Sequence, residues 1–352
     1  MSIKITSGDL LKADVDALVN TVNCVGVMGK GIALQFKKKW PTAFKEYKKL
    51  CDAKKLRPGM MHVFERGQIA EKPHYIINFP TKDHWRSKSK IEYIDAGLVA
   101  LVETIKQHNI KSIAIPPLGC GNGGLEWKMI SEKLQHYLKD LGEEINIYIY
   151  PPAGAPQAMD MVVKTKRPKM TTGRAVLVKL IESYSQLNYS LSKIEIQKLC
   201  YFAQELGQPL RLNYTKNQFG PYADNLRHVL NAIDGHFIKG VGDHDTSDMN
   251  LALTDGVITE ADDCLKEDSE TLDRLPALSR LIDGFETPFG MELLATVHWI
   301  VTKEVKSYDL EKVYHAIKNW SSTASWNERK IALMKKPLVD RTIKHLQHIA
   351  VI

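Results

Sequence analysis

The stretch Ala17-Leu-Val-Asn-Thr-Val-Asn-Cys-Val-Gly-Val-Met-Gly-Lys-Gly31 decides the fold that this sequence predicts. Its first six residues are typical of a buried strand, and Ile32-Ala-Leu-Gln-Phe36 after it is typical of a helix. Three glycines lie between them, where they let a ligand approach the backbone unobstructed by side chains. The stretch therefore predicts a strand, a ligand-binding loop and a helix, in that order.

A second glycine cluster, Gly119-Cys-Gly-Asn-Gly-Gly124, follows another apolar strand-like segment, Ser112-Ile-Ala-Ile-Pro116. Two loops that each leave a strand and enter a helix offer a diphosphate free backbone N–H groups and the positive end of a helix dipole. Neither loop has the spacing of a P-loop or of the dinucleotide fingerprint. One loop alone is as readily a tight turn, but the pair favours a nucleotide-diphosphate pocket.

Strand-like and helix-like segments alternate through the first part of the chain, which predicts a three-layer α/β fold with a mostly parallel or mixed sheet. The expected strands are 3–6, 17–22, 62–66, 74–79, 112–116 and 145–150, and the expected helices are 31–39, 42–56, 91–107 and 126–141. In an open α/β sheet the ligand lies beyond the carboxyl ends of the strands. Both glycine loops fall at that edge.

Length and composition indicate a globular protein of two domains or one large one, since 44% of the 352 residues are hydrophobic and 25% are charged. No apolar run approaches the roughly 20 residues of a membrane span. The N-terminal residues Met1-Ser-Ile-Lys-Ile-Thr6 lack the charged and apolar regions of a signal peptide. We therefore expect a cytoplasmic protein without a membrane partner.

The five cysteines are widely separated and form no CxxC pair, so the sequence indicates neither a disulfide framework nor a zinc site. We expect no metal and no cofactor. Cys24 and Cys120 lie inside the glycine loops, where a catalytic thiol is one interpretation. Because no base is evident beside them, the favoured interpretation is that both are small loop-filling residues.

Charge divides the chain into three parts. Residues 1–155 carry 23 Lys and Arg against 16 Asp and Glu, a net charge of +7. Residues 156–174 carry 5 against 1, net +4, and residues 175–352 carry 20 against 24, net −4. Pro151-Pro-Ala-Gly-Ala-Pro156 and Lys164-Thr-Lys-Arg-Pro-Lys169 have the composition of a linker. We predict domains at 1–155 and 175–352, joined by a basic, proline-containing linker at 156–174.

Four motifs occur in order along the first domain: Ser7-Gly-Asp-Leu10, Val19-Asn-Thr-Val-Asn23, Gly26-Val-Met-Gly-Lys-Gly-Ile-Ala33 and Pro117-Leu-Gly-Cys-Gly-Asn-Gly-Gly-Leu-Glu-Trp127. With them this domain resembles a macrodomain, the ADP-ribose-binding fold. Met28-Gly-Lys-Gly-Ile-Ala33, Phe36-Lys-Lys-Lys39 and Phe79-Pro-Thr-Lys82 are similar to one branch, the DarG-type antitoxins. That resemblance implies a hydrolase that removes ADP-ribose placed on DNA bases by a DarT-type ADP-ribosyltransferase toxin.

The resemblance also implies which residues bind ADP-ribose. Asp9 would accept a hydrogen bond from the adenine amino group, which suits an ionised carboxylate, and Asn23 would bind the distal ribose. On the residues alone, Asp9 could instead cap a short helix and Asn23 could form a turn. The implied ligand-binding residues are Asp9, Leu10, Asn20, Asn23, Gly26, Val27, Met28, Gly29, Gly31, Ile32, Ala33, Thr81, Leu118, Gly119, Cys120, Gly121, Asn122, Gly123, Gly124 and Leu125.

Lys82 is the implied catalytic residue, because the related glycohydrolases use a lysine after the strand that here ends in Asn78-Phe-Pro-Thr81. Cleavage at an anomeric carbon passes through an oxocarbenium-like state, which a lysine of lowered pKa can resolve. The protein-directed relatives add an aspartate from the second loop, where this chain has Gly123. Lys82 would then position or deprotonate the linkage, or work with water, and His84 is a candidate proton carrier.

Two basic segments with aromatic residues indicate nucleic acid as the substrate. Lys37-Lys-Lys39 with Trp40, and Lys82-Asp-His-Trp-Arg-Ser-Lys-Ser-Lys90, combine cations that contact phosphates with rings that stack on unpaired bases. We therefore expect ADP-ribosylated, single-stranded DNA as the partner. The alternative is a solvated helix face, with Trp40 in the core.

The second half shows no catalytic motif and has the helical periodicity of a binding domain. Gln197-Lys-Leu-Cys-Tyr-Phe-Ala-Gln204 and the predicted turn Phe219-Gly-Pro-Tyr222 resemble a helical domain family found in antitoxins. Between Val241 and Asp273 there are eleven acidic residues and one lysine. We expect a loop or edge segment there that occupies the cationic cleft of the toxin, or else a solvated acidic loop.

Three functions follow from these patterns. In the first, the chain is an antitoxin that hydrolyses ADP-ribose from DNA and binds its toxin through the second domain. In the second, it is a non-catalytic ADP-ribose reader that acts by protein interaction. In the third, it releases ADP-ribose from modified protein, which the glycine at position 123 argues against.

Overall fold

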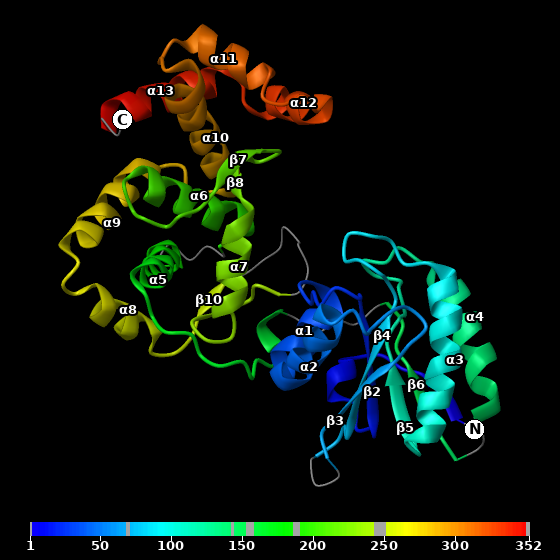
Figure 1. Ribbon diagram of the computed structural model, residues 1–352. Helices are drawn as coiled ribbons and strands as arrows, with labels where there is room; N and C mark the ends of the chain where they lie inside the picture. The colour runs from blue at the N-terminus through cyan, green and yellow to red at the C-terminus, as the bar shows by residue number, and fades with distance from the viewer. Residues whose placement is uncertain are drawn as a thin grey trace. The chain divides into compact units, whose positions relative to one another are not determined.

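The computed structural model describes residues 2–67, 71–141, 144–152, 158–185, 191–242 and 251–349. They form two compact units, one holding the described residues up to Lys166 together with Gly242, and the other holding Arg167–Val241 and the described residues from 251 to 349. Figure 1 draws the first unit in blue to green and the second in green to red. The division between Lys166 and Arg167 falls inside the range predicted as a linker. Residues 153–156 of the predicted proline-rich stretch, and residue 157 after it, lie outside the described residues.

The first unit is built on a six-stranded sheet of described strands with the order β1-β6-β5-β2-β4-β3. Its strands are β1 (Ser2–Ile5), β2 (Ala17–Val22), β3 (His62–Glu65), β4 (Tyr75–Pro80), β5 (Ser112–Ile115) and β6 (Asn146–Ile149). All neighbours pair in parallel except β3 and β4, which are antiparallel. The predicted mostly parallel sheet is confirmed.

Helices cover both faces of this sheet, as Figure 1 shows. On one face lie α1 (Gly31–Lys39) and α2 (Pro41–Asp52), and on the other lie α3 (Ile91–Gln107) and α4 (Trp127–Leu138). Leu98 and Leu101 of α3 pack against Ile77 and Ile113 of the sheet, while Phe36 of α1 packs on the opposite face. Because each helix turns one apolar face to the strands, the result is the predicted three-layer fold.

Short 3-10 turns and helix ends account for the differences from the predicted boundaries. The helix expected to reach Leu56 ends at Asp52, because Lys54 takes a left-handed backbone conformation with φ of 55°. The helix expected at 126–141 is α4 followed by the turn η2 (Lys139–Leu141). Two further turns are η1 (Leu10–Lys12) and η3 (Ala158–Asp160).

The second unit is mainly helical, as predicted. Its helices are α5 (Thr172–Ser185), α6 (Lys193–Glu205), α7 (Asp224–Ile233), α8 (Val257–Leu265), α9 (Ser269–Ile282), α10 (Pro288–Trp299), the π-helix η4 (Ile300–Val305), α11 (Leu310–Lys318), α12 (Ala324–Leu333) and α13 (Lys336–Ile349). They enclose one apolar core. None of the helices in the described ranges is both long and apolar enough to cross a membrane.

The turn predicted before α7 is part of a hairpin of β7 (Tyr214–Asn217) and β8 (Gly220–Ala223). The side-chain amide of Gln197 explains its position, since it both donates to the Ala223 carbonyl and accepts from the Ala223 N–H, each at 3.0 Å. The two-residue strand pair β9 (Ile238–Lys239) and β10 (Ala252–Leu253) follows. The Gln197 bonds that hold the hairpin are not readable from local periodicity, because Gln197 and Ala223 lie 26 residues apart.

The prediction of a loop or edge segment between Val241 and Asp273 is wrong for most of its described part, which forms α8 and the start of α9. Residues 243–250 of that stretch lie outside the described residues. Val257, Ala261 and Leu265 are buried at a spacing of four residues, which is the apolar face of a helix. The carboxylates occupy the outer face, so we name α8 and α9 the acidic helices.

Candidate active site

Three segments meet at the carboxyl ends of β2, β4 and β5. They are the first glycine loop (residues 23–31), the second glycine loop (residues 117–126) and Lys82. The Cys24 N–H donates to the Asp83 carbonyl at 3.0 Å, which ties the first loop to the Lys82 segment. The Lys82 ammonium donates to the Asn122 carbonyl, and a Cβ on Gly31 would lie 3.3 Å from Asn122 Nδ2. The structure thus brings the predicted lysine and both predicted loops together.

Asn23 shapes the first glycine loop. Its Oδ1 accepts from the Val25 N–H at 3.0 Å and the Val27 N–H at 3.3 Å, while its Nδ2 donates to the Val27 carbonyl at 2.6 Å. The Tyr47 hydroxyl donates to the Asn23 carbonyl at 2.7 Å. These bonds are those of a turn-forming asparagine, which the sequence left as the alternative. Contact between Asn23 and the distal ribose stays a prediction.

The second glycine loop is held by local backbone hydrogen bonds that leave three of its N–H groups without a protein acceptor in the described structure. The Gly124 N–H bonds to the Gly121 carbonyl and the Leu125 N–H bonds to the Gly119 carbonyl, both at 3.0 Å. Among the described residues, the N–H groups of Gly121, Asn122 and Gly123 donate to no protein acceptor. Three consecutive free N–H groups suit the oxygens of a diphosphate.

Gly123 admits no side chain. A Cβ there would lie 2.2 Å from the Gly119 carbonyl oxygen and 2.3 Å from Ser89 Oγ, and the Ser89 N–H donates to the Gly123 carbonyl at 3.0 Å. Ser89 also supports the second glycine loop. The sequence motifs do not identify it, because its role depends on packing. An aspartate at position 123 does not fit this loop conformation.

Asp9 lies at the other end of the first unit's binding edge and is an N-cap. Its Oδ1 accepts from the Leu11 N–H at 2.9 Å, while Oδ2 lies 4.0 Å from the Lys12 ammonium. The capping interpretation is therefore correct for one oxygen. The second oxygen remains a hydrogen-bond acceptor at the rim of a small pocket, so binding of adenine by Asp9 stays a prediction.

Lys82 is half-buried, and burial lowers the pKa of its ammonium. The neighbouring thiols behave in the opposite way, because burial disfavours their anions. Burial, with smaller contributions from Asp83 and Cys51, raises the pKa of Cys24 to about 12, and burial raises the pKa of Cys120 to about 11. Neither thiol is a ready nucleophile, which agrees with their interpretation as loop-filling residues.

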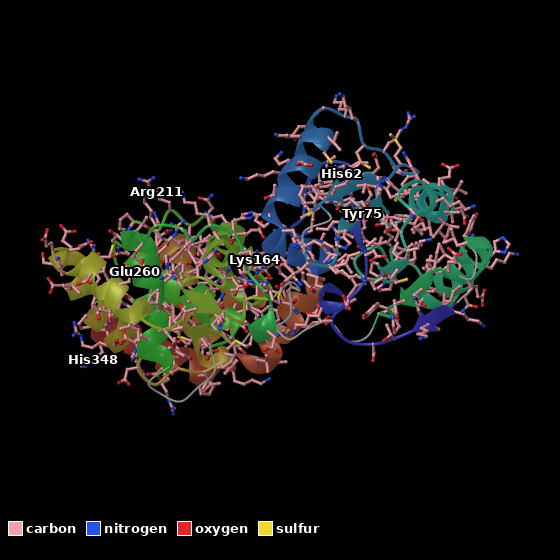
Figure 2. The ribbon with its side chains drawn as sticks, turned by 90° about the horizontal axis from the view of Figure 1, so that it is seen from below. His62, Tyr75, Lys164, Arg211, Glu260 and His348 are labelled. Atoms are coloured by element: carbon pink, nitrogen blue, oxygen red, sulfur yellow. The ribbon has the colours of Figure 1, made fainter. Side chains whose placement is uncertain are left out.

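A buried polar chain crosses the sheet beneath the first loop. Asn20 Nδ2 donates to Asn78 Oδ1 at 2.8 Å, and Asn78 Nδ2 lies 2.9 Å from Nδ1 of His62, which Figure 2 labels. Burial lowers the pKa of His62. Asn20 Oδ1 is buried without a partner in the described structure. The sequence predicted Asn20 but missed Asn78 and His62, whose pairing depends on strand register.

The two predicted nucleic-acid segments differ in exposure. Trp40 is only 8% exposed and packs in the core with Phe36, so its interpretation as a stacking surface is wrong. Trp85 is 45% exposed, with the Arg86 guanidinium 4.6 Å from its ring centroid and the His84 ring stacked at 5.6 Å. A cationic and aromatic surface therefore exists in the tryptophan loop (residues 82–90).

The remaining predicted residues differ in burial. Leu10, Gly26, Met28, Gly31, Thr81, Leu118 and Gly119 are buried; Gly29, Ile32, Ala33, Cys120 and Leu125 are partly exposed; Val27, Gly121, Asn122 and Gly124 are exposed. Within the described ranges no three His, Cys, Asp or Glu side chains gather so that they could hold a metal ion. The site is a backbone cradle with one amine at its edge.

The strand order, the paired glycine loops and the lysine between them define a macrodomain protein, and residues 19–134 match the family model of the Macro domain. The chain is 41% identical over 340 residues to a DNA ADP-ribosyl glycohydrolase of Thermus aquaticus, covering 96% of this chain and 91% of the relative. It is 44% identical over 314 residues to the Mycobacterium tuberculosis protein of that name, covering 85% and 88%. The chain belongs to the DNA ADP-ribosyl glycohydrolase family.

A third relative and two solved structures match a smaller share of the chain. A DNA ADP-ribosyl transferase-DNA ADP-ribosyl glycohydrolase fusion protein of Thermosipho africanus is 34% identical over 162 residues, 42% of each chain. The macrodomain of Mycobacterium tuberculosis DarG is 53% identical with a TM-score of 0.42, covering 43% of this chain and 98% of its own. Thermosipho africanus DarTG in complex with ADP-ribose is 37% identical with a TM-score of 0.40, covering 43% and 42%.

Proposed function

We propose that this chain is an antitoxin enzyme that hydrolyses ADP-ribose from bases of single-stranded DNA. The observation that carries the proposal is the junction at Asn122, where the Lys82 ammonium meets the second glycine loop beside the first. In ADP-ribose the distal ribose follows the diphosphate. An amine at the end of the loops that would bind the diphosphate is therefore close to the expected position of that ribose. Relatives that match 96% and 85% of this chain are named DNA ADP-ribosyl glycohydrolase, which supports the proposal.

In the proposed complex, Asp9 accepts from the adenine amino group and the N–H groups of the glycine loops bind the diphosphate. The free donors at Gly121, Asn122 and Gly123 support this arrangement. The N-terminus of α1, which begins at Gly31, adds the positive end of its dipole. The distal ribose then lies toward Lys82.

Lys82 acts at the anomeric carbon of that ribose. Its lowered pKa increases the fraction of uncharged amine, which can attack the carbon or take a proton from the sugar or from water. The oxygen of a water molecule bonds to the anomeric carbon as the bond between that carbon and the DNA base breaks. The DNA base takes up a proton as it leaves. Because Gly123 has no room for a side chain, this reaction proceeds without the second-loop aspartate.

The tryptophan loop is proposed to hold the DNA strand. Trp85 offers an exposed ring for stacking, while Arg86, Lys88 and Lys90 offer charge for phosphates. The loop begins at Lys82, so a strand bound there presents its modified base beside the amine. This adjacency favours DNA over acidic protein side chains as the carrier of ADP-ribose.

The substrate test compares two carriers with the full-length protein. One sample holds single-stranded DNA with ADP-ribose on a base, and the other holds protein with ADP-ribose on Asp and Glu side chains. We expect release of free ADP-ribose from the DNA at least about 100-fold faster. Faster release from protein would favour the protein-directed hydrolase, and binding without any release would favour the reader.

The second unit is proposed to neutralise a DarT-type ADP-ribosyltransferase. One relative is named as a fusion of a DNA ADP-ribosyl transferase and a DNA ADP-ribosyl glycohydrolase, which supports a transferase as the partner. The acidic helices and the turn between them present Asp263, Glu267 and Asp273 as exposed carboxylates without an ion pair among the described residues. A cleft that binds DNA is cationic, and such carboxylates complement it.

A triple variant tests this contact. Asp263→Asn, Glu267→Gln and Asp273→Asn together remove three charges from the acidic helices and the turn between them, and we expect toxin affinity to fall at least about tenfold with a weaker salt dependence. The matched control removes three charges elsewhere, by Glu311→Gln, Glu328→Gln and Asp340→Asn. Equal affinity of both variants and the wild type would contradict the proposed contact.

A further inference from the structure

The tryptophan loop is attached at both ends to the second glycine loop. At its start, the Lys82 ammonium donates to the Asn122 carbonyl. At its end, the Ser89 N–H donates to the next carbonyl along the second glycine loop, that of Gly123, at 3.0 Å. Both carbonyls belong to residues whose own N–H groups have no acceptor among the described residues. The loop proposed for DNA and the loop proposed for the diphosphate therefore share two hydrogen bonds.

The tip of the tryptophan loop is a local turn between these two ends. The Ser87 N–H donates to the His84 carbonyl at 3.0 Å, and the Arg86 N–H donates to Nδ1 of His84 at 3.2 Å. Trp85 lies within this turn and is exposed. A base that stacks on Trp85 therefore restrains a short segment whose two ends are bonded to the second glycine loop.

The side chain of Ser89 is wedged between two glycines of the second glycine loop. Ser89 is only 6% exposed. A Cβ on Gly119 would lie 3.0 Å from both Cβ and Oγ of Ser89, and a Cβ on Gly123 would lie 2.3 Å from Oγ. Atoms packed this closely transmit displacements, because there is no space between them to absorb a shift. A shift of Ser89 therefore moves the backbone that carries the diphosphate donors.

The hydroxyl of Ser89 has no role in the structure as it stands. Its Oγ is buried and has no hydrogen-bond partner among the described residues. A buried hydroxyl without a partner destabilises a fold, so native structures keep few of them. A hydroxyl can rotate to donate or to accept, and the second glycine loop lies directly against this one. An arrangement of that loop in which Oγ gains a backbone partner is more stable by one hydrogen bond.

We propose that Ser89 couples the two ligands, so that a DNA strand on the tryptophan loop strengthens the binding of ADP-ribose by the second glycine loop. The proposal rests on the proposed function, because it takes the tryptophan loop as the DNA contact and the second glycine loop as the diphosphate contact. Ser89 is a positioning residue, since it acts through the loop against which it packs. The coupling is reciprocal, and ADP-ribose strengthens the binding of DNA by the same factor.

Such coupling favours release of the products. ADP-ribosylated DNA carries both ligands in one molecule and occupies both loops together, so the substrate is bound in the strengthened state. After cleavage either product can leave alone, and the product that remains is then bound more weakly. The enzyme thereby distinguishes ADP-ribose on DNA from free ADP-ribose.

Calorimetric titration of the full-length protein with ADP-ribose measures the coupling, first without DNA and then with saturating, unmodified single-stranded DNA of about 12 nucleotides. For the wild type we expect DNA to increase the affinity for ADP-ribose about tenfold. Ser89→Ala removes Oγ and keeps Cβ. We expect this variant to bind ADP-ribose alone within about threefold of the wild type and to lose most of the increase.

Thr104→Val is the matched control. It also removes a buried hydroxyl from the first unit, at a residue on α3 that is 8% exposed and donates to the Ala100 carbonyl at 2.7 Å. Because Thr104 packs on neither glycine loop in any printed contact of Gly119 or Gly123, its variant should keep the tenfold increase. An increase in the wild type and in this control that Ser89→Ala lacks would support the proposal.

The other outcomes separate the inference from the proposed function. Equal affinity for ADP-ribose with and without DNA in the wild type would overturn the coupling and leave the proposed hydrolase intact. The role of Ser89 would be overturned if Ser89→Ala kept the full increase. It would also be overturned if Ser89→Ala lost affinity by the same factor with and without DNA, because Ser89 would then only support the fold. Wild-type protein that binds no ADP-ribose, or no single-stranded DNA, would overturn both.

Discussion

Lys82 in the first unit and Lys198 in the second are two lysines whose pKa burial lowers, yet their surroundings differ. Lys198 is 1% exposed, its pKa is lowered to about 7, and its ammonium donates to the Pro221 carbonyl at 2.5 Å. Lys82 has the smaller shift and lies half-buried beside two glycine loops. A lowered pKa by itself therefore does not mark a catalytic amine; access to a ligand site does.

The environment of Lys198 explains its burial as structural. A Cβ on Gly220 would lie 3.5 Å from the Lys198 ammonium, so the lysine supports the tight hairpin of β7 and β8. Glu292 nearby is paired with Arg329 at 2.6 Å and with Lys330 at 2.9 Å. The charged groups are satisfied by one another and by backbone, which leaves none of them facing a substrate.

The largest expected effect comes from Lys82→Ala. We expect the release of ADP-ribose from DNA to fall at least about 1,000-fold, with ADP-ribose affinity changed by less than about threefold. Wild-type release should also rise with pH, since deprotonation frees the amine whose pKa is lowered. Single-turnover assays and calorimetry measure the two quantities. If Lys198→Ala lost as much activity per folded molecule, the comparison of the two lysines would fail.

The second largest expected effect is a loss of ADP-ribose affinity when a side chain is added to the second glycine loop. Gly123→Ala places a Cβ 2.2 Å from the Gly119 carbonyl oxygen, whereas Gly121→Ala meets nothing within 4 Å. We expect ADP-ribose affinity to fall about 100-fold for the first and to change little for the second. Calorimetry on both variants measures the difference. Similar affinities would mean that the second loop does not hold the diphosphate.

Trp85→Ala has a smaller expected effect, confined to DNA. Loss of one stacking ring costs about 1–3 kcal/mol per base, so the KM for modified DNA should rise about tenfold while free ADP-ribose binds as before. Val99→Ala, which truncates an apolar residue that is 50% exposed on α3, is the control. An unchanged KM would exclude Trp85 from the DNA contact.

The smallest effect on activity belongs to Lys198→Met, which should alter only stability. Between pH 7 and about 10.4 the unfolded chain holds a proton on this lysine that the folded chain lacks, so the free energy of unfolding rises with pH by up to about 1.4 kcal/mol per unit. Below that window both states are protonated. Urea unfolding at several pH values should show this rise for the wild type and less of it for the variant. Identical slopes would contradict the buried titration.

The strands, the helices and the glycine loops could be predicted because each depends on local pattern. Apolar runs alternate with amphipathic stretches, and Gly119 to Gly124 cluster where a strand ends. The acidic helices were also readable, since Val257, Ala261 and Leu265 repeat every four residues. The many acidic residues between these apolar positions favour the interpretation as a loop over that of a helix.

What the sequence could not predict depends on contacts between distant residues. Trp40 follows Lys39 and Trp85 precedes Arg86, so both lie beside basic residues in the sequence. Packing buries Trp40 and leaves Trp85 exposed. The pairing of Asn78 with His62 depends on strand register. Lys164 was assigned to a linker by composition, which carries no information on its backbone bond to α1.

A crystal structure of the full-length protein with ADP-ribose tests the central claim most directly. We predict the diphosphate between residues 26–31 and 119–124, with Lys82 Nζ about 3–3.5 Å from the anomeric carbon of the distal ribose. A diphosphate bound elsewhere would contradict the account. So would a Lys82 ammonium that stays on the Asn122 carbonyl and points away from the sugar.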